Sequence, residues 1–557
     1  MTSCKTVKAL FWLVLSFAVA VACSTKKEHL ETATNKQVSI PFLTKQGNTT
    51  QLFVNDEPYI ILGGELGNST FTSVESMEPV WSKLKAMNLN TVLAPVYWEI
   101  IEPQEGVYDF ELLDQLIEEA RNQELKLVLL WFASWKNSMS SHVPAWVKKD
   151  QERFPRVKDD AGKSHEILTP FSENNLNADL KAFQALMKHL KEFDGKDRTV
   201  IMIQPENEIG MLPSARDYHP LANQKFEENV PQEFIEYLKR NKDDLVPEFR
   251  AVWEKTGFNT SGNWEDIFGV GTHTDEIFMA WYYAQFTNTI IEAGKEIYPL
   301  PMFVNAALNR PGREPGKGYP SAGPLPHIMD VWMAGGSAID FLSPDFYFPN
   351  IEHWCDLYTR QGNSLFIPEH RFDNTVAAKA LFTIGHYESM GFSPFSIEST
   401  DEPENEELGK VYAMVDQLTP IIAEHQGAGK IEGVLLDKEN QETVLVFGDY
   451  KMTFKHSHTL GWEGDSKNEV WEPSGAIIIQ TDDREFYIAG SGIVATFEKK
   501  NEPTITVGIL KNEEGRFENG EWKVFRHLNG DQTHQGRHVR IFRGEYSIQR
   551  LELYEYE

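Results

Sequence analysis

Residues Val200–Gly210 read VIMIQPENEIG, and residues Leu365–Arg371 read LFIPEHR. Each stretch runs from a β-prone apolar segment through a proline to an acidic residue, Glu208 in the first and Glu369 in the second. Carboxylates that follow the ends of parallel strands are presented at the C-terminal rim of a (β/α)8 barrel. The two stretches therefore predict two barrel strands, each ending in a carboxylate.

Strand-like and helix-like segments alternate along most of the chain, and the strand-like ones number eight. No glycine-rich phosphate motif follows any of them, and eight exceeds the strand number of a typical doubly wound sheet. We therefore predict an α/β fold, a (β/α)8 TIM barrel over residues 41–426 that ends in a helix at about 406–425. The predicted strands are 59–64, 90–97, 125–132, 199–204, 302–306, 339–344, 365–368 and 392–397.

The pattern changes after about Gly427, where short alternating segments follow one another without a long helical period. Examples are 443–447, 476–479, 485–489 and 493–497. Turn signals such as Asn519-Gly520 and Asn529-Gly530 separate such segments. Residues 427–557 are therefore predicted to form an all-β sandwich accessory domain.

The N-terminus has the pattern of a secretory signal: Lys5 and Lys8 precede an apolar run, 9–21, that is too short to span a membrane. The run ends in AVACS (20–24), which resembles a bacterial lipoprotein processing site with Cys23 as the lipidated residue. An ordinary cleaved signal with a chance cysteine is the alternative. We predict a signal peptide over 1–22 and a lipidated tether over 23–40. This places the protein in the bacterial cell envelope, periplasmic or at the outer-membrane surface, with the lipid as its membrane contact.

Composition argues against several other functions. The net charge of −30 disfavours nucleic-acid binding, which requires clustered Lys and Arg. Of the three cysteines, Cys4 leaves with the signal and Cys23 carries lipid, so Cys355 has no partner for a disulfide in the mature chain. No Cys and His residues stand at zinc-ligand spacing. We predict no metal and no cofactor, and the oligomeric state stays open.

The motifs around the two glutamates resemble those of the clan of retaining (β/α)8 glycosidases. The segment PENEIG (205–210) resembles the acid/base motif of glycoside hydrolase family 35, the β-galactosidases, and NTVLAPVYWEIIEPQEGVYDF (90–110) resembles that family's second barrel unit. Gly64-Glu65-Leu66 and HVPAWV (142–147) are similar as well. The C-terminal part resembles the accessory domain of a bacterial subgroup. The spacing of the two glutamates is also similar to that in family 42, another β-galactosidase family of the clan.

The resemblance implies a retaining exo-β-galactosidase that removes terminal β-D-galactosyl residues from oligo- or polysaccharides. Glu208 would be the acid/base and Glu369 the nucleophile, with His370 or Arg371 expected to lower the pKa of Glu369. Glu206 competes with Glu208 for the acid/base role, but we expect it to be an ion-paired structural residue.

The candidate substrate-binding residues follow the strand ends of the same barrel. Asn207 would bond the sugar 2-hydroxyl or cap its loop. Tyr347 would orient Glu369 or pack at the rim, and the three tryptophans would stack on a sugar or belong to the core. The full set is Glu65, Trp131, Trp135, Asn207, Asn305, Trp332 and Tyr347.

The chain departs from family 35 at two sugar-contacting sites. The pattern Trp-Asn-x-His-Glu-Pro reads WEIIEP at 98–103, and Ala-Glu-Trp reads ASW at 133–135. A same-clan glycosidase for another sugar (β-glucoside, β-mannoside or α-L-arabinopyranoside) is therefore one alternative. The other is a glycan-binding surface lipoprotein without activity, which the joint presence of Asn207 and the two glutamates disfavours because binding does not require the acid pair.

Overall fold

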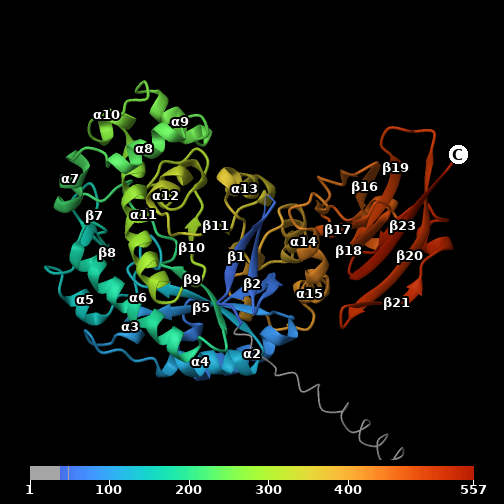
Figure 1. The fold of residues 1–557 in the computed structure, drawn as a ribbon, viewed down its shortest axis with the longest axis horizontal. Helices are drawn as coiled ribbons and strands as arrows, with labels where there is room; N and C mark the ends of the chain where they lie inside the picture. Colours follow the sequence, from blue (N-terminus) through green and yellow to red (C-terminus); the bar gives the residue numbers. More distant parts are fainter. Residues whose placement is uncertain (1–37, 48) are drawn as a thin grey trace, which may run out of the picture. The chain divides into compact units, whose positions relative to one another are not determined.

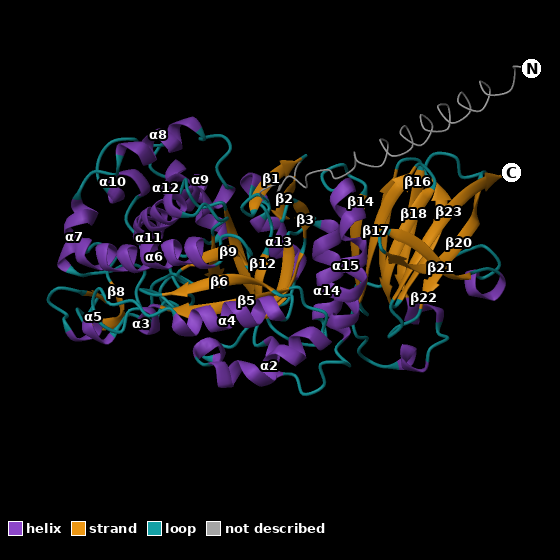
Figure 2. Ribbon diagram, turned by 60° about the horizontal axis from the view of Figure 1, so that its bottom comes forward, coloured by secondary structure: helices purple, strands orange, loops and turns teal. Residues whose placement is uncertain are grey.

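The computed structural model describes residues 38–47 and 49–557 (Figures 1 and 2). The predicted signal peptide, Cys23 and all but the last residues of the predicted tether lie outside the described residues. Residues 40–557 form one compact unit. In the described part of the chain, no helix is both long and apolar enough to cross a membrane.

Eight parallel strands form the barrel, in the order β10-β11-β12-β13-β4-β5-β6-β9. A bridge between Ile203 and Met302 brings β9 and β10 together and joins the two edges of the sheet. Every predicted strand is present and begins within two residues of its predicted start. The predicted TIM barrel is thus confirmed. The strands are β4 (Ile61–Glu65), β5 (Thr91–Tyr97), β6 (Lys126–Phe132), β9 (Val200–Pro205), β10 (Phe303–Ala307), β11 (Phe341–Phe346), β12 (Ile367–His370) and β13 (Gly391–Pro394).

The barrel strands are apolar because both of their faces are covered, one by the barrel interior and one by helices. All seven residues of β5 and all six of β9 are buried. Helices cover the outside of the barrel. They include α2 (Val74–Ala86), α4 (Glu111–Asn122), α6 (Glu173–Phe193), α11 (Thr272–Ile297), α14 (Val376–His386) and α15 (Glu407–His425). Helix α4 buries a single apolar stripe, whereas α11 and α14 are buried around most of their circumference because further elements pack on them.

Four short helices after β9 escape prediction from the sequence. Between five and nine residues give too few turns for a helical period to stand out. Aromatic contacts hold some of them on α11: the rings of Phe234 and Trp281 stack with their centres 4.7 Å apart, and Trp264 meets Phe278 edge-on at 5.3 Å. These helices are α7 (Pro220–Glu227), α8 (Gln232–Arg240), α9 (Pro247–Glu254) and α10 (Trp264–Phe268).

Two antiparallel sheets make up the C-terminal part, as predicted. One has the order β14-β17-β18-β23-β20-β21 and the other β15-β16-β19-β22. An apolar cluster with members from both sheets, such as Met452 and Ile488, fills the space between them. The strands are β14 (Ile431–Leu436), β15 (Glu442–Phe447), β16 (Tyr450–His456), β17 (Ser474–Asp482), β18 (Glu485–Ser491), β19 (Ile493–Lys499), β20 (Thr506–Glu518), β21 (Glu521–His527), β22 (Val539–Ile541) and β23 (Ser547–Tyr556).

The helix α14 lies directly on β14 and β17, so the larger sheet is covered on both faces. Small residues permit backbone contact: a Cβ on Gly433 would lie 2.6 Å from the carbonyl oxygen of Phe382, and one on Gly475 would lie 2.8 Å from that of Ala378. Apolar residues on this face of the sheet, including Ile477, belong to the same core cluster as the barrel. The barrel and the sandwich therefore share one core.

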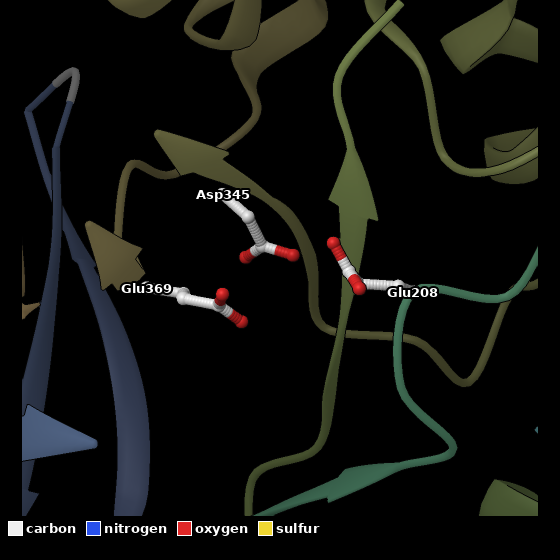
Figure 3. A group of neighbouring side chains, drawn as sticks. All are labelled: Glu208, Asp345 and Glu369. Atoms are coloured by element: carbon white, nitrogen blue, oxygen red, sulfur yellow. The ribbon is translucent and has the colours of Figure 1, made fainter. Parts of the chain in front are cut away.

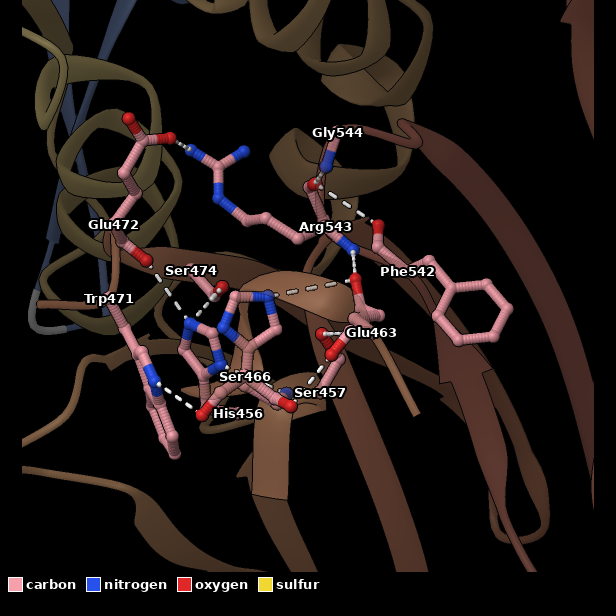
Figure 4. A network of polar contacts seen from close by, with 12 residues as sticks. His456, Ser457, Glu463, Ser466, Trp471, Glu472, Ser474, Phe542, Arg543 and Gly544 are labelled. Atoms are coloured by element: carbon pink, nitrogen blue, oxygen red, sulfur yellow. Dashed lines mark hydrogen bonds and ion pairs between the residues drawn. The ribbon is translucent and has the colours of Figure 1, made fainter. Parts of the chain in front are cut away.

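A polar network lies at the edge of this contact and centres on Arg543 (Figure 4). The guanidinium pairs with both carboxylate oxygens of Glu407 in α15, at 2.7 and 2.6 Å, and with Glu472 at 3.1 Å. The backbone N–H of Arg543 donates to Glu463 at 3.1 Å. Because the guanidinium is bound on several sides, this network is a structural link between helix and sheet.

Candidate active site

The turn after β9 sends Glu206 and Glu208 into different surroundings. Both have a left-handed backbone, with φ of 63° and 41°. The N–H of Asn207 donates to the Trp135 carbonyl at 3.1 Å, and that of Glu208 donates to Asn305 Oδ1 at 2.9 Å. These bonds hold a conformation that costs a non-glycine residue about 1–3 kcal/mol. As a result, Glu206 is turned into the core while Glu208 faces the barrel mouth.

Three carboxylates meet at the mouth (Figure 3): Glu208 after β9, Asp345 in β11 and Glu369 in β12. An oxygen of each lies within 4.8 Å of an oxygen of the other two. Asp345 and Glu369 are direct partners in the register of the parallel strands β11 and β12. The strand-end arrangement predicted for Glu208 and Glu369 thus brings them together.

Asp345 and Lys136 are site residues that the sequence analysis missed. The stretch FLSPD (341–345) carries the signature that singles out the two glutamates, an apolar strand followed by a proline and an acid. The predicted strand stopped at Pro344, one residue short. Lys136 follows β6 and has no such signature, so only the tertiary structure identifies it as a site residue.

Two buried amides connect the ends of β9, β10 and β11. Asn207 Oδ1 accepts from Gln204 at 2.7 Å and from Asn305 at 3.0 Å. Asn305 Nδ2 also donates to Asp345 at 2.8 Å, and Asn207 Nδ2 donates to the Lys136 carbonyl at 2.9 Å. Both predicted site amides are therefore part of the network that holds Glu208 and Asp345 in place, while contact of either amide with a sugar stays a prediction.

Tyr347, just past β11, donates a hydrogen bond from its hydroxyl to Glu369 Oε1. Burial and the charge of Glu208 raise the pKa of Glu369 to about 7, while Lys136 and the Tyr347 hydroxyl lower it. The expected effect of His370 or Arg371 is wrong. Burial and Lys379 lower the pKa of His370 to about 4, so this imidazole is neutral, and Arg371 donates to the Tyr347 carbonyl at 3.1 Å.

The remaining carboxyls of the mouth also have raised pKa values. Burial raises the pKa of Glu208, and Lys136 opposes this rise. Burial and the charge of Glu369 raise the pKa of Glu65, in β4, and of Asp345 well above their usual values. Four carboxyls therefore share one nearby lysine, and some of them are protonated at neutral pH.

The three candidate tryptophans are not at the mouth, which corrects the prediction of sugar stacking. Each is 0% exposed. Trp131 donates to Asp179 of α6 at 3.0 Å, and Trp332 donates to the Ala322 carbonyl at 3.1 Å. Trp135 meets Tyr283 and Phe286 edge-on at 5.4 and 4.9 Å. Their large apolar rings are buried in the core, so no face is open to a ligand.

Glu206 is a structural residue but not an ion-paired one, which corrects the second expectation. Among residues 38–47 and 49–557, no Lys or Arg nitrogen lies within 4.0 Å of its carboxylate. Its Oε2 accepts from the Trp135 N–H at 2.7 Å, and its carboxyl is hydrogen-bonded to that of Asp179. Burial and the charge of Asp179 raise the pKa of Glu206 well above its usual value, which favours the protonated form of this carboxyl.

The trio of Glu208, Asp345 and Glu369 has the oxygen donors that a hard divalent cation prefers. The same oxygens suit proton transfer and attack on carbon, which need no metal. The absence of a metal and of any cofactor stays a prediction.

Two family models match the chain. Residues 72–268 match a model of glycosyl hydrolase family 42 described as Beta-galactosidase. This segment runs from α2 to α10 and contains Glu208. Residues 408–540 match a domain of unknown function, DUF5597, which covers most of α15 as well as strands of both sheets.

A β-galactosidase from Xanthomonas manihotis is 26% identical over 221 residues. The match covers 38% of this chain and 32% of the relative, so it spans about a third of the relative's length. With the family model, it identifies a β-galactosidase-like segment of the family 42 type. Family 35 itself is not confirmed, although the two belong to one clan.

Solved β-galactosidases are similar in fold. A catalytic mutant of the family 42 enzyme from G. stearothermophilus superposes with a TM-score of 0.50 at 12% identity, covering 92% of this chain and 100% of the other. The cold-adapted enzyme from Rahnella sp. R3 gives 0.45 at 16% identity, covering 65% and 57%. At 12% identity, the superposition on the G. stearothermophilus enzyme supports the fold of this chain and does not assign a function.

Proposed function

We propose that this protein is a retaining exo-β-galactosidase that hydrolyses terminal β-D-galactosyl residues of glycans. The observation that carries the proposal is the pair Glu208 and Glu369, whose carboxylate oxygens lie within 4.8 Å at the mouth of the barrel. Retaining pairs stand about 5–5.5 Å apart, whereas inverting pairs leave room for a water at about 6.5–9.5 Å. The match of residues 72–268 to a β-galactosidase model supports the choice of sugar.

In the first step Glu208 protonates the glycosidic oxygen while Glu369 attacks the anomeric carbon. The aglycone leaves and a galactosyl ester forms on Glu369. In the second step Glu208 removes a proton from water, which attacks the same carbon and releases galactose with retained configuration. Asn207 and Asn305 hold Glu208 and Asp345 in position throughout.

Proton placement follows from the surroundings of the pair. Burial raises and Lys136 lowers the pKa of both carboxyls, so neither factor chooses between them. The Tyr347 hydroxyl bonds Glu369 alone, so it favours the charge on Glu369 and leaves the proton that the pair retains on Glu208. When Glu369 becomes an ester its charge disappears. The pKa of Glu208 then falls, and this residue becomes the base that the second step requires.

The nucleophile assignment is tested by trapping. A 2-deoxy-2-fluorogalactoside with a good leaving group should label Glu369, as located by peptide mapping, because the fluorine slows hydrolysis of the ester. Glu369→Gln should be folded, unlabelled and inactive. Label on another carboxylate would refute the assignment.

The acid/base assignment is tested by azide rescue. Glu208→Ala should lose activity on substrates with poor leaving groups by about 10²–10⁴-fold. It should still be galactosylated by activated aryl galactosides. Azide needs no base, so it should restore turnover and give the β-azide. Glu206→Ala is the matched control and should show no rescue by azide. Rescue of Glu206→Ala and not of Glu208→Ala would assign the acid/base role to Glu206. An α-azide product would exclude a retaining mechanism.

The sugar and the cellular location are further parts of the proposal. A panel of nitrophenyl β-galactoside, β-glucoside, β-mannoside and α-L-arabinopyranoside tests the first, with the galactoside expected to be fastest. Lipid anchoring at Cys23 in the cell envelope is tested by Cys23→Ala, which should move the active protein from the membrane to the soluble fraction. A variant that still sediments with membranes would contradict the anchor.

A further inference from the structure

Two carboxylates of the barrel mouth, Glu208 and Asp345, line a pocket of about 490 Å³. Glu208, Asp345 and Tyr347 line the pocket together with Arg310 and Arg371. Lys317 adds a third cation. Glu208 and Asp345 are the acidic residues among the lining groups that the structure describes. We call Arg310, Lys317 and Arg371 the cationic wall of this pocket. Such a group of cations is unusual in a chain with a net charge of −30.

Two of the cations lie on either side of the loop that carries Tyr347. Arg310 follows β10, Tyr347 and Phe348 follow β11, and Arg371 follows β12, and these three strands are neighbours in the barrel. The Arg310 guanidinium lies 5.6 Å from the centre of the Phe348 ring. Arg371 donates to the Tyr347 carbonyl at 3.1 Å. Each guanidinium is thus held in place by a contact that leaves most of its five N–H donors available.

These charges have no acidic partner in the part of the chain that the structure describes. No Asp or Glu oxygen in residues 38–47 or 49–557 lies within 4.0 Å of a side-chain nitrogen of Arg310, Lys317 or Arg371. Arg216, by contrast, pairs with Asp275 at 2.9 Å.

The charges of the cationic wall do not account for the pKa values of Glu208 and Glu369. Lys136 is the cation whose charge lowers the pKa of Glu208 and Glu369. The positive charges of Arg310, Lys317 and Arg371 are therefore available to a bound molecule.

The position of the acid/base identifies which part of a substrate enters the pocket. Under the proposed function, on which this inference rests, Glu208 must contact the leaving-group oxygen, so the aglycone lies on its side. The charges of Glu208 and Asp345 repel an anion, whereas those of Arg310, Lys317 and Arg371 attract one. A negative charge is thus favoured on the sugar beyond the scissile bond and disfavoured on the galactose.

We propose that this pocket is the aglycone subsite and that Arg310, Lys317 and Arg371 select an aglycone bearing a carboxylate or a sulfate. Guanidinium groups bind both anions through paired N–H donors. The substrates would then be acidic glycans in which a terminal β-galactosyl residue is attached to a uronic acid or to a sulfated sugar.

The test compares substrates that differ in the charge of the aglycone. We expect kcat/KM at low salt to be about two- to fivefold higher for 4-carboxyphenyl β-galactoside than for its uncharged 4-carbamoylphenyl analogue. The ratio should approach one as salt screens the wall. A 4-sulfophenyl galactoside forms a second arm, and the larger ratio distinguishes a carboxylate site from a sulfate site.

Variants assign the preference to the wall. The ratio should fall towards one in the double variant Arg310→Gln/Lys317→Gln and in Arg371→Gln. It should persist in Arg153→Gln, which removes an arginine paired with Glu105 outside the pocket. Hydrolysis of the uncharged substrate without a preference for either anion, or a preference that survives both wall variants, overturns the inference alone. Failure to hydrolyse any of the galactosides would instead refute the proposed function.

Discussion

The hydroxyl of Tyr347 donates a hydrogen bond to Oε1 of Glu369, so the loop after β11 acts on the ionisation of a carboxylate in β12. The bond opposes burial and the charge of Glu208, which together raise the pKa of Glu369 to about 7. A nucleophile must be ionised, and the fraction that is ionised near neutral pH depends on this balance.

Tyr347→Phe should shift the acidic limb of the kcat/KM profile to higher pH. Loss of the hydroxyl raises the pKa of Glu369 further, so the carboxylate is protonated over a wider range and activity at pH 6 falls, by about tenfold for one pKa unit. Tyr319→Phe is the control, since Tyr319 lines the same pocket but its hydroxyl donates to Glu276, at 3.2 Å, and not to Glu369. An unchanged acidic limb in Tyr347→Phe would contradict the role of the hydroxyl.

Glu208→Gln should move the same limb in the opposite direction. The charge of Glu208 raises the pKa of Glu369, so its removal lowers that pKa and keeps the nucleophile ionised at more acidic pH. The measurement uses an activated aryl galactoside, which forms the ester without a general acid. A shift to higher pH would show that the two carboxyls are not coupled in this way.

Glu206→Gln should stabilise the protein increasingly as pH rises. The folded-state pKa of Glu206 is raised, so wild-type stability falls from about pH 4.3, the unfolded value, up to the folded pKa. A glutamine keeps a bond to the Trp135 N–H and does not ionise. Thermal unfolding at pH 5 and pH 8 measures the difference.

Glu206→Ala should instead lose about 1–3 kcal/mol at either pH, because the buried N–H of Trp135 has lost its acceptor. Equal effects of the glutamine variant at both pH values would mean that Glu206 is ionised in the folded protein.

Gly433→Ala should destabilise the contact between barrel and sandwich. The added Cβ would lie 2.6 Å from the Phe382 carbonyl oxygen, and a helix backbone cannot yield without moving α14. We expect a loss of about 1–3 kcal/mol in the free energy of unfolding, measured by denaturant titration. Gly464→Ala has open space around its Cβ and should be nearly neutral. Equal stability of the two variants would show that the helix and sheet are not in such close contact.

Chelation should leave turnover unchanged, and excess Ca²⁺ or Mn²⁺ should inhibit. A cation bound by Glu208, Asp345 and Glu369 would occupy the place of the sugar and hold the general acid ionised. Asp345→Asn removes one anionic ligand and should weaken this inhibition. Loss of activity in EDTA that a metal restores would show that the reaction uses the ion.

Much of the barrel can be predicted from local patterns in the sequence. A strand buried on both faces is apolar throughout, so β5 and β9 are visible as continuous apolar runs, and the long α6 and α11 show a full helical period. The short α7 to α10 are not visible, because their stability comes from contacts such as Phe234 with Trp281. Asp345 was missed because the predicted strand ended at Pro344, one residue before it, and element boundaries are the least defined part of such a prediction.

The sequence by itself determined the eight-stranded barrel, the following sandwich and the two glutamates after strand ends, because these depend on periodicity and on order along the chain. The tertiary structure alone decided that Glu208 and not Glu206 faces the mouth, since two left-handed residues break the alternation of side chains. It also placed the three tryptophans in the core and brought Asp345 and Lys136 to the site. Burial and neighbouring charge set each pKa, and both come from residues far apart in sequence: Asn305 holds Glu208 across 97 positions.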